Sequence, residues 1–212
     1  RHTRCADVTG VQTVLFRSVA VGREALNSNT TASNNTAVGY QAGYGNTTGS
    51  ANTFVGDSSG YTNSTGIYNA AFGRRSMYAN TTGSYNTALG AQDAGNAGAL
   101  SANTTGGYNT SVGNGSLASN TTASYNTAVG YQAAYSNTTG NILDAFGGQT
   151  MYSNTTGTNN VAFGSLGLYA NTTGSYNTAV GRQALTSNTT ANFNTAVGYQ
   201  AAYTNTTGAG IT

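Results

Sequence analysis

The sequence predicts an all-β fold: a β-solenoid of the parallel β-helix or β-roll type, with about eleven 17-residue coils. Three observations lead to this prediction. A glycine closing an "AVG"-like triplet recurs along the chain, and nine of the ten intervals between these glycines equal the interval from Gly22 to Gly39. The segment "YNTAV" before each glycine alternates large and small side chains and is bounded by turn residues, which is typical of a short strand. Helical repeat units run past thirty residues, so one or two short strands with tight turns must form each coil.

The N-terminal segment, residues 1–17, does not follow the repeat. Cys5 lies one full period before the first repeat glycine. Gln12 and Val14 occupy the positions at which the repeat has Asn and Thr. Two explanations stay open. The segment is a cap, since terminal repeats are often atypical, or it is translated sequencing-adapter sequence, which it resembles. The repeat array itself covers residues 18–212.

The glycine that ends each unit, here called the anchor glycine, has no substitute in eleven units. We expect each anchor glycine to need a positive φ or to have no room for a Cβ atom. A second glycine, in "NTTG", is replaced by alanine at Ala32, Ala123 and Ala191, so that turn does not require a left-handed residue. The anchor glycines are Gly22, Gly39, Gly56, Gly73, Gly90, Gly113, Gly130, Gly147, Gly164, Gly181 and Gly198.

The two faces of the strand differ in residue size. The residue before each anchor glycine is apolar, and we expect this column to form the core. The column before it points to the opposite face. It is small and uncharged, so we expect a second layer, from either the same coil or another chain, to approach it closely. The apolar column is Val21, Val38, Val55, Phe72, Leu89, Val112, Val129, Phe146, Phe163, Val180 and Val197. The small column is Ala37, Ala71, Ala88, Ala128, Ala145, Ala162, Ala179 and Ala196, with Phe54 and Ser111 as exceptions.

One interval, between Gly90 and Gly113, is longer than the other nine. Removal of residues 93–98 restores the period, so we expect these residues to leave the stack as a loop and Gly90 and Gly113 to lie in adjacent coils. The last unit stops three residues short of its next anchor. We expect the chain to belong to a longer array.

Stacked coils place like residues above like residues, at a strand spacing of roughly 4.8 Å that gives a rod on the order of 50 Å long. Asparagine occurs seven residues after every anchor glycine when residues 93–98 are set aside, so its side chains can form an amide ladder. The Asn-Thr/Ser-Thr triplets also match glycosylation acceptors, but we interpret them as turns in which Asn bonds the backbone. The eleven asparagines are Asn29, Asn46, Asn63, Asn80, Asn103, Asn120, Asn137, Asn154, Asn171, Asn188 and Asn205.

The charge pattern excludes several classes of function. From residue 18 onward there are four arginines and four acids, so the array offers no basic face for nucleic acid. No apolar run reaches the length of a membrane span. The acids Glu24, Asp57, Asp93 and Asp144 occupy unrelated columns, and we interpret them as solvated residues. We predict no catalytic, cofactor-binding or metal site and no cofactor; His2 and Cys5 are too few ligands for a metal.

The fifteen tyrosines fall in three columns. Rows of aromatic rings can bind sugars, which suits recognition of a cell-surface glycan or receptor. The alternative is stacking that stabilises the ladder or a seam between chains, and we favour stacking because Tyr has this structural use in every unit.

The unit "YNTAVGYQA" resembles the head repeats of trimeric autotransporter adhesins, which are β-rolls, and "NTTGSYNTAVGYQAL" resembles arrays in phage tail fibres and related bacterial surface proteins. This resemblance implies a homotrimeric fibre at the cell surface, outside the cell or on a virion tail. We therefore expect a structural or adhesive fibre segment that is not an enzyme and does not insert into a membrane. The alternative is a monomeric ice-binding β-solenoid. It is less favoured because the two threonines of each unit are adjacent and would face opposite sides of a strand.

Overall fold

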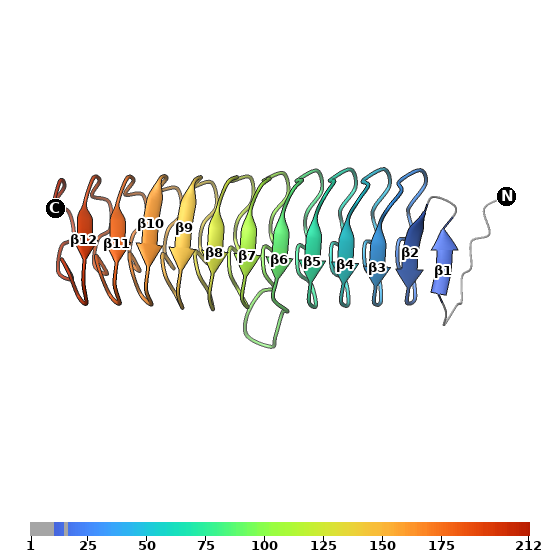
Figure 1. The fold of residues 1–212 in the computed structure, drawn as a ribbon, viewed down its shortest axis with the longest axis horizontal. Coiled ribbons are helices and arrows are strands. Elements are labelled where there is room, and N and C mark those ends of the chain that lie inside the picture. Colours follow the sequence, from blue (N-terminus) through green and yellow to red (C-terminus); the bar gives the residue numbers. More distant parts are fainter. Residues whose placement is uncertain (1–10, 15–16) are drawn as a thin grey trace.

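The structure, a computed structural model, describes residues 11–14 and 17–212, which form a row of stacked coils (Figure 1). The strands are β1 Val11–Val14, β2 Ser18–Val21, β3 Thr36–Val38, β4 Thr53–Val55, β5 Ala70–Phe72, β6 Thr87–Leu89, β7 Thr110–Val112, β8 Thr127–Val129, β9 Leu143–Phe146, β10 Asn160–Phe163, β11 Thr178–Val180 and β12 Thr195–Val197. Strands β2 to β12 pair in parallel and in sequence order, whereas β1 pairs with β2 antiparallel. The described part of the chain contains no helix. The predicted β-solenoid with 17-residue coils is confirmed.

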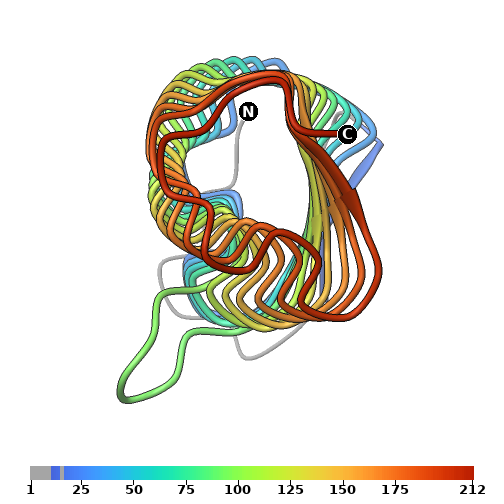
Figure 2. The ribbon, with the colours of Figure 1, turned by 90° about the vertical axis from the view of Figure 1, so that its left-hand side faces the viewer.

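Each coil contains a single strand, and turns complete the rest of the coil. The strand is shorter than the predicted "YNTAV" segment, because the tyrosine that opens this segment has a left-handed backbone, as at Tyr125 with φ 61°. The turns are bonded from coil to coil: the N–H of Leu117 donates to the carbonyl of Ala133 at 3.0 Å, and that of Ser119 to Tyr135 at 3.0 Å. Backbone hydrogen bonds therefore continue around the coil, and Figure 2 shows the coils superposed end on, with the strands along one straight side.

The prediction that the Val/Phe column forms the core is wrong. The small column points inward instead, with alanines such as Ala88 and Ala128 fully buried, while Leu89 beside Ala88 is 50% exposed. The rest of the core comes from the turn four residues after the anchor glycine. This column supplies Leu26, Met77, Leu100, Leu117, Met151, Leu168 and Leu185. Because these long side chains already fill the narrow coil, the small column of most strands contributes only a methyl group to the interior.

Phe54 demonstrates how little space the interior has. It is the single aromatic residue in the small column, and it is fully buried. The two turn positions that contact it are Gly43 and Gly60 instead of Leu or Met, and an added Cβ at these glycines would lie 2.8 Å and 2.3 Å from the Phe54 ring. One large side chain thus replaces two others, as constant packing density requires.

Two asparagine ladders run through the interior. In the predicted ladder, Nδ2 of Asn137 donates to Oδ1 of Asn120 at 3.0 Å and to the carbonyl of Gly140 at 2.9 Å. The amide ladder and the Asn turn are both confirmed. A second ladder uses the Asn of "YNT": Oδ1 of Asn109 accepts from the N–H of Asn126 at 3.0 Å, and Nδ2 of Asn126 donates to the same Gly140 carbonyl at 3.0 Å. These buried amides are acceptable because the backbone of the turns supplies their partners.

The expectation for the anchor glycines is also confirmed. Ten of the eleven have φ between 120° and 141°, as in Gly73 and Gly130. The eleventh, Gly90, has no room for a side chain, since an added Cβ would lie 2.4 Å from the carbonyl oxygen of Gly113. The anchor glycines therefore stack directly on one another at the end of each strand.

The long unit keeps the register of the sheet. Leu89 in β6 pairs with Val112 in β7, as the corresponding residues do in every other pair of coils. The N–H of Gln92 donates to the preceding coil, at the carbonyl of Arg74, and the carbonyl of Ala97 accepts from Gly115 in the following coil. The chain between Gln92 and Ala97 extends away from the stack as the loop seen in Figures 1 and 2.

Candidate functional site

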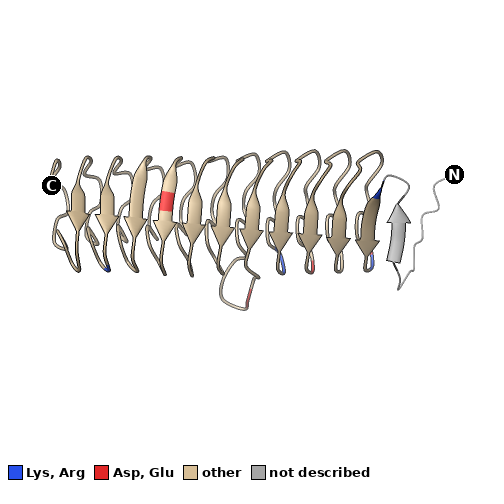
Figure 3. Cartoon of the chain, viewed as in Figure 1, with Lys and Arg blue, Asp and Glu red and all other residues tan. Residues whose placement is uncertain are grey.

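The charged residues are few, and most of them lie in the turn that follows an anchor glycine, along one edge of the row of coils (Figure 3). Arg23 and Glu24 form an ion pair of 3.5 Å at a turn, and Asp57 accepts a hydrogen bond of 2.6 Å from Ser58. Asp144 lies on β9. Among residues 11–14 and 17–212, no three His, Cys, Asp or Glu side chains are arranged to hold a metal ion. His2 and Cys5 lie outside the described residues.

The loop at residues 93–98 is organised by Asp93. Its Oδ1 accepts from the N–H groups of Gly95 and Asn96 at 3.0 Å and 2.8 Å, and its Oδ2 accepts from Asn114 at 3.1 Å. The hydrogen bond from Gly95, followed by those from Asn96 and Asn114, holds the pKa of Asp93 below its ordinary value. Nδ2 of Asn96 also contacts the same carboxylate, and Oδ1 of Asn96 accepts from Gln132 at 2.6 Å. The described partners of this carboxylate are backbone N–H groups and side-chain amides, so its role is to shape the loop.

The Asn-Thr-Thr triplets lie at turns, with their asparagines inside the coil. Asn137 is fully buried, and its Nδ2 already makes two hydrogen bonds. The hydroxyl of the first threonine, Thr138, donates to the carbonyl of Thr155 in the next coil at 3.0 Å. Thr139, the second threonine, is exposed. The pair therefore does not lie on opposite faces of a strand, as the sequence suggested, because it belongs to a turn.

The outer face of the sheet carries two parallel columns. One is the apolar column, in which Phe72, Leu89 and Phe163 are 39%, 50% and 44% exposed. The other lies two residues earlier and is mainly threonine, as at Thr110 and Thr127. Stacked rings occur here as well, since Phe163 lies 4.7 Å from the ring of the preceding coil's phenylalanine. The outer strand face is thus an uncharged strip, apart from Asp144.

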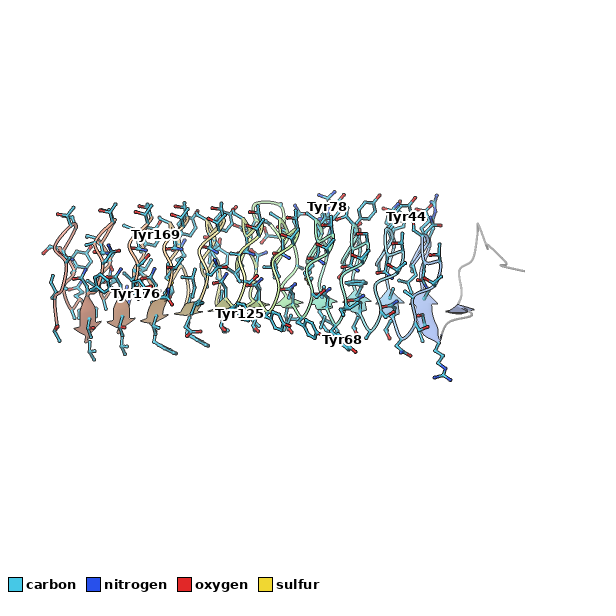
Figure 4. The ribbon with its side chains drawn as sticks, turned by 90° about the horizontal axis from the view of Figure 1, so that it is seen from above. Tyr44, Tyr68, Tyr78, Tyr125, Tyr169 and Tyr176 are labelled. Atoms are coloured by element: carbon cyan, nitrogen blue, oxygen red, sulfur yellow. The ribbon has the colours of Figure 1, made fainter. Side chains whose placement is uncertain are left out.

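Tyrosines form two stacked rows on different sides of the rod (Figure 4). The row beside the strands contains Tyr68, Tyr85, Tyr108 and Tyr125, with centroids 4.8–5.1 Å apart. The second row lies at the turns and consists of two separate stacks with spacings of 5.1–5.4 Å: Tyr44, Tyr61 and Tyr78, and then Tyr135, Tyr152 and Tyr169. The predicted stacking is confirmed. Since each ring face covers its neighbour, the interior members of a row offer mainly their edges and hydroxyl groups to a ligand.

The second tyrosine row also has altered acidity. Desolvation, followed by the charges of neighbouring tyrosines, raises the pKa of Tyr61 and Tyr152 above the ordinary value of 10.0. The physical cause is that a phenolate in the row loses part of its hydration and would lie close to other phenolates.

Sequence reasoning missed the left-handed residues. In each regular coil three positions have φ near 50–60°, as at Tyr125, Gln132 and Ala134. Such φ values are rare for bulky residues, and the residue types at these positions do not predict them. The sequence gives an indirect indication of the left-handed backbone, since glycine occupies the third of these positions at Gly43 and Gly60.

No family model matches the chain. No curated protein and no solved structure matches it either. Within the part of the chain that the structure describes, no helix is long and apolar enough to cross a membrane.

Proposed function

We propose that the chain is a structural or adhesive fibre segment: a spacer, or the surface-binding shaft of a phage tail fibre or bacterial surface adhesin. The observation that carries this proposal is the uniformity of the rod. Eleven strands in one parallel register are joined by recurring turns, and each coil bonds to its neighbours. Such an array lengthens by duplication without redesign, which suits a protein that holds something away from a surface.

The proposed homotrimer has support from the outer strand face. A monomer leaves Phe72, Leu89 and Phe163 at 39%, 50% and 44% exposure along one strip of the rod. Contiguous exposed apolar surface of this kind is typical of interaction sites. The seam between chains is therefore the Val/Phe column, and the alanine column, which the sequence suggested for this role, is already filled.

Light scattering on the full chain tests this assembly. We expect a mass three times that of the 21.4 kDa chain. Phe163→Asp on the outer strand face should return the protein to a monomer without unfolding it, because a buried unpaired charge is costly at a seam. Thr173→Asp, on an exposed turn, is the matched control and should leave the mass unchanged. A parent protein that stays monomeric in dilute solution would contradict the trimer.

The origin of the fibre is tested by the sequence that flanks this chain in its gene. A downstream intramolecular chaperone would support a phage fibre, and a membrane-anchor β-barrel would support a bacterial adhesin on the outer cell surface. A host-surface role also predicts binding of the rod to glycans or receptors of the target cell. A complete hydrolase site built from residues of the array would overturn the proposal of a non-enzymatic fibre.

A second candidate, a monomeric ice-binding protein, is favoured by one observation. Threonines such as Thr110 and Thr127 recur on the outer strand face beside the apolar column, with one repeat per coil. The column is interrupted by Ala70, Asp144 and Val161, which makes the fibre the better supported proposal. Inhibition of ice recrystallisation by the monomeric protein would favour this candidate.

A further inference from the structure

We propose that the rod has a binding groove for elongated, planar, uncharged aromatic molecules, which lie parallel to the rod axis against the tyrosine row at Tyr85, Tyr108 and Tyr125. The proposal does not depend on the fibre function. It rests on the shape, the periodicity and the chemistry of one shallow groove on the outer surface.

The groove runs across three coils between two columns of side chains. Exposed threonines, Thr82 and Thr105, form one wall, and tyrosine rings form the other. The residues that line it are Thr82, Ser84, Tyr85, Thr105, Gly107, Ser124, Tyr125 and Tyr108. Both walls repeat once per coil, so the groove follows the rod axis, as the row from Tyr68 to Tyr125 does in Figure 4.

A missing side chain gives the groove its depth. The floor column carries Ser84 and Ser124 on either side of Gly107, so the middle of the floor has no side chain. The N–H of Gly107 is already bonded to Oγ of Ser124 at 3.1 Å. The floor is therefore flat and its polar backbone group is satisfied, which favours a flat ligand.

The tyrosine wall determines the chemical class. The rings of Tyr85, Tyr108 and Tyr125 stack at 4.8 Å and 5.0 Å, with interplanar angles of 5° and 4°. They are 44%, 53% and 60% exposed, so their edges are accessible although their faces are covered. The positively polarised edges of these stacked rings attract the electron-rich face of an aromatic molecule by edge-to-face contact. A rigid conjugated molecule spanning three coils, roughly 15 Å long, would touch every edge at once.

The groove lacks charged side chains, which argues against a salt-dependent mode of binding. None of the eight residues lining the groove is charged. Binding should therefore change little with ionic strength, in contrast to the attachment of an ion to a charged surface.

The test measures the fluorescence of an uncharged dimethylaminophenyl-benzothiazole dye with the full chain. We expect saturable binding whose affinity is unaffected by salt. Tyr108→Ser should weaken it by about tenfold, since it interrupts the row of ring edges. Tyr152→Ser, in the middle of the second row, is the matched control and should leave the affinity unchanged.

Gly107→Ile provides the decisive variant, because it leaves the tyrosines in place. A Cβ added at Gly107 would lie 2.9 Å from the carbonyl oxygen of Ser84. A small backbone shift relieves this contact, since the same column carries side chains at Ile67 and Ser124. The side chain should fill the floor and abolish binding, while the near-UV circular dichroism of the tyrosine row is retained. Unchanged binding to Gly107→Ile, an equal loss in Tyr152→Ser, or no binding to the parent protein would each overturn the proposal.

Discussion

The anchor glycines and the turn glycines of "NTTG" are both crowded, yet only the anchor glycines are invariant. An added Cβ would lie 2.4 Å from the next coil's carbonyl oxygen at anchor Gly130, and 2.3 Å from it at turn Gly140. The difference lies in the backbone, because Gly130 has φ 141° and Gly140 has no positive φ. A small shift between coils relieves a contact, whereas an L-residue cannot relieve a forbidden φ.

The turn at Ala123 illustrates such a shift. In glycine coils the N–H of the second threonine also donates to the next coil, as from Thr139 to the carbonyl of Thr155 at 3.2 Å. In the coil of Ala123, only the N–H of Thr121 donates to the next coil's Thr138 carbonyl. The alanine is thus accommodated by the loss of one weak hydrogen bond.

Gly43 and Gly60 form a third class of glycine. Their φ values are 61° and 59°, but Leu26 and Met77 have φ 50° at the same position of other coils. A φ of this size therefore does not require glycine in this fold. The ring of Phe54 requires it, because that ring occupies the space of the missing side chains.

The largest expected effect tests this third class. Phe54→Ala should lower the free energy of unfolding by about 4 kcal/mol, because it leaves a cavity between two glycines. The triple variant Phe54→Ala/Gly43→Leu/Gly60→Leu recreates the interior of the other coils and should recover most of the loss. Chemical denaturation followed by circular dichroism measures both. A triple variant less stable than Phe54→Ala would show that φ, and not space, requires these glycines.

The next effect separates the anchor and turn classes directly. Gly130→Ala should cost about 3 kcal/mol, since alanine must adopt a φ that only glycine tolerates. Gly140→Ala should stay within about 1 kcal/mol of the parent, because its backbone is compatible with alanine. Thermal unfolding of the two variants side by side provides the measurement, and equal losses would mean that crowding alone makes a glycine invariant.

A smaller effect tests the hydrogen bonds that the asparagine side chains donate to the backbone of the turn. The carbonyl of Gly140 accepts from Asn137 and from Asn126. Asn137→Ala should cost about 2 kcal/mol, because buried ladder partners lose a donor. Asn205→Ala, in the last coil where the asparagine is only partly buried, should cost less. Hydrogen exchange of the amides around each site would report the difference, and equal protection in both variants would contradict it.

The smallest effect concerns pH. The pKa of Tyr61 is raised in the folded protein by desolvation and by neighbouring tyrosines, so folding favours the neutral phenol. This contribution is complete below the ordinary pKa and is lost as the pH rises through the higher folded value. We expect the melting temperature of the parent to fall more than that of Tyr61→Phe between about pH 8 and about pH 11. Identical falls would show that the row does not resist ionisation.

The sequence alone determined the period, the all-β solenoid, the short strand before each anchor glycine, the strain at that glycine and the Asn turn. These features follow from local chemistry that repeats in register, so every coil provides the same evidence. The two tyrosine rows could also be predicted, because residues in one column must stack when the coils do. The groove could not, since the period does not predict that the threonine column and the tyrosine column border one hollow with Gly107 at its floor.

The tertiary structure alone decided which face of the strand is inside. Hydrophobicity favoured Val and Phe for the interior, but closure of so short a coil leaves room there only for Ala beside Leu or Met. The period predicts that equivalent positions of successive coils align. It does not predict whether a column of side chains faces the interior of the coil or the solvent. That choice depends on the volume enclosed when the turns close the coil. The sequence reflects this volume at Phe54, where Gly43 and Gly60 replace the larger turn residues of other coils.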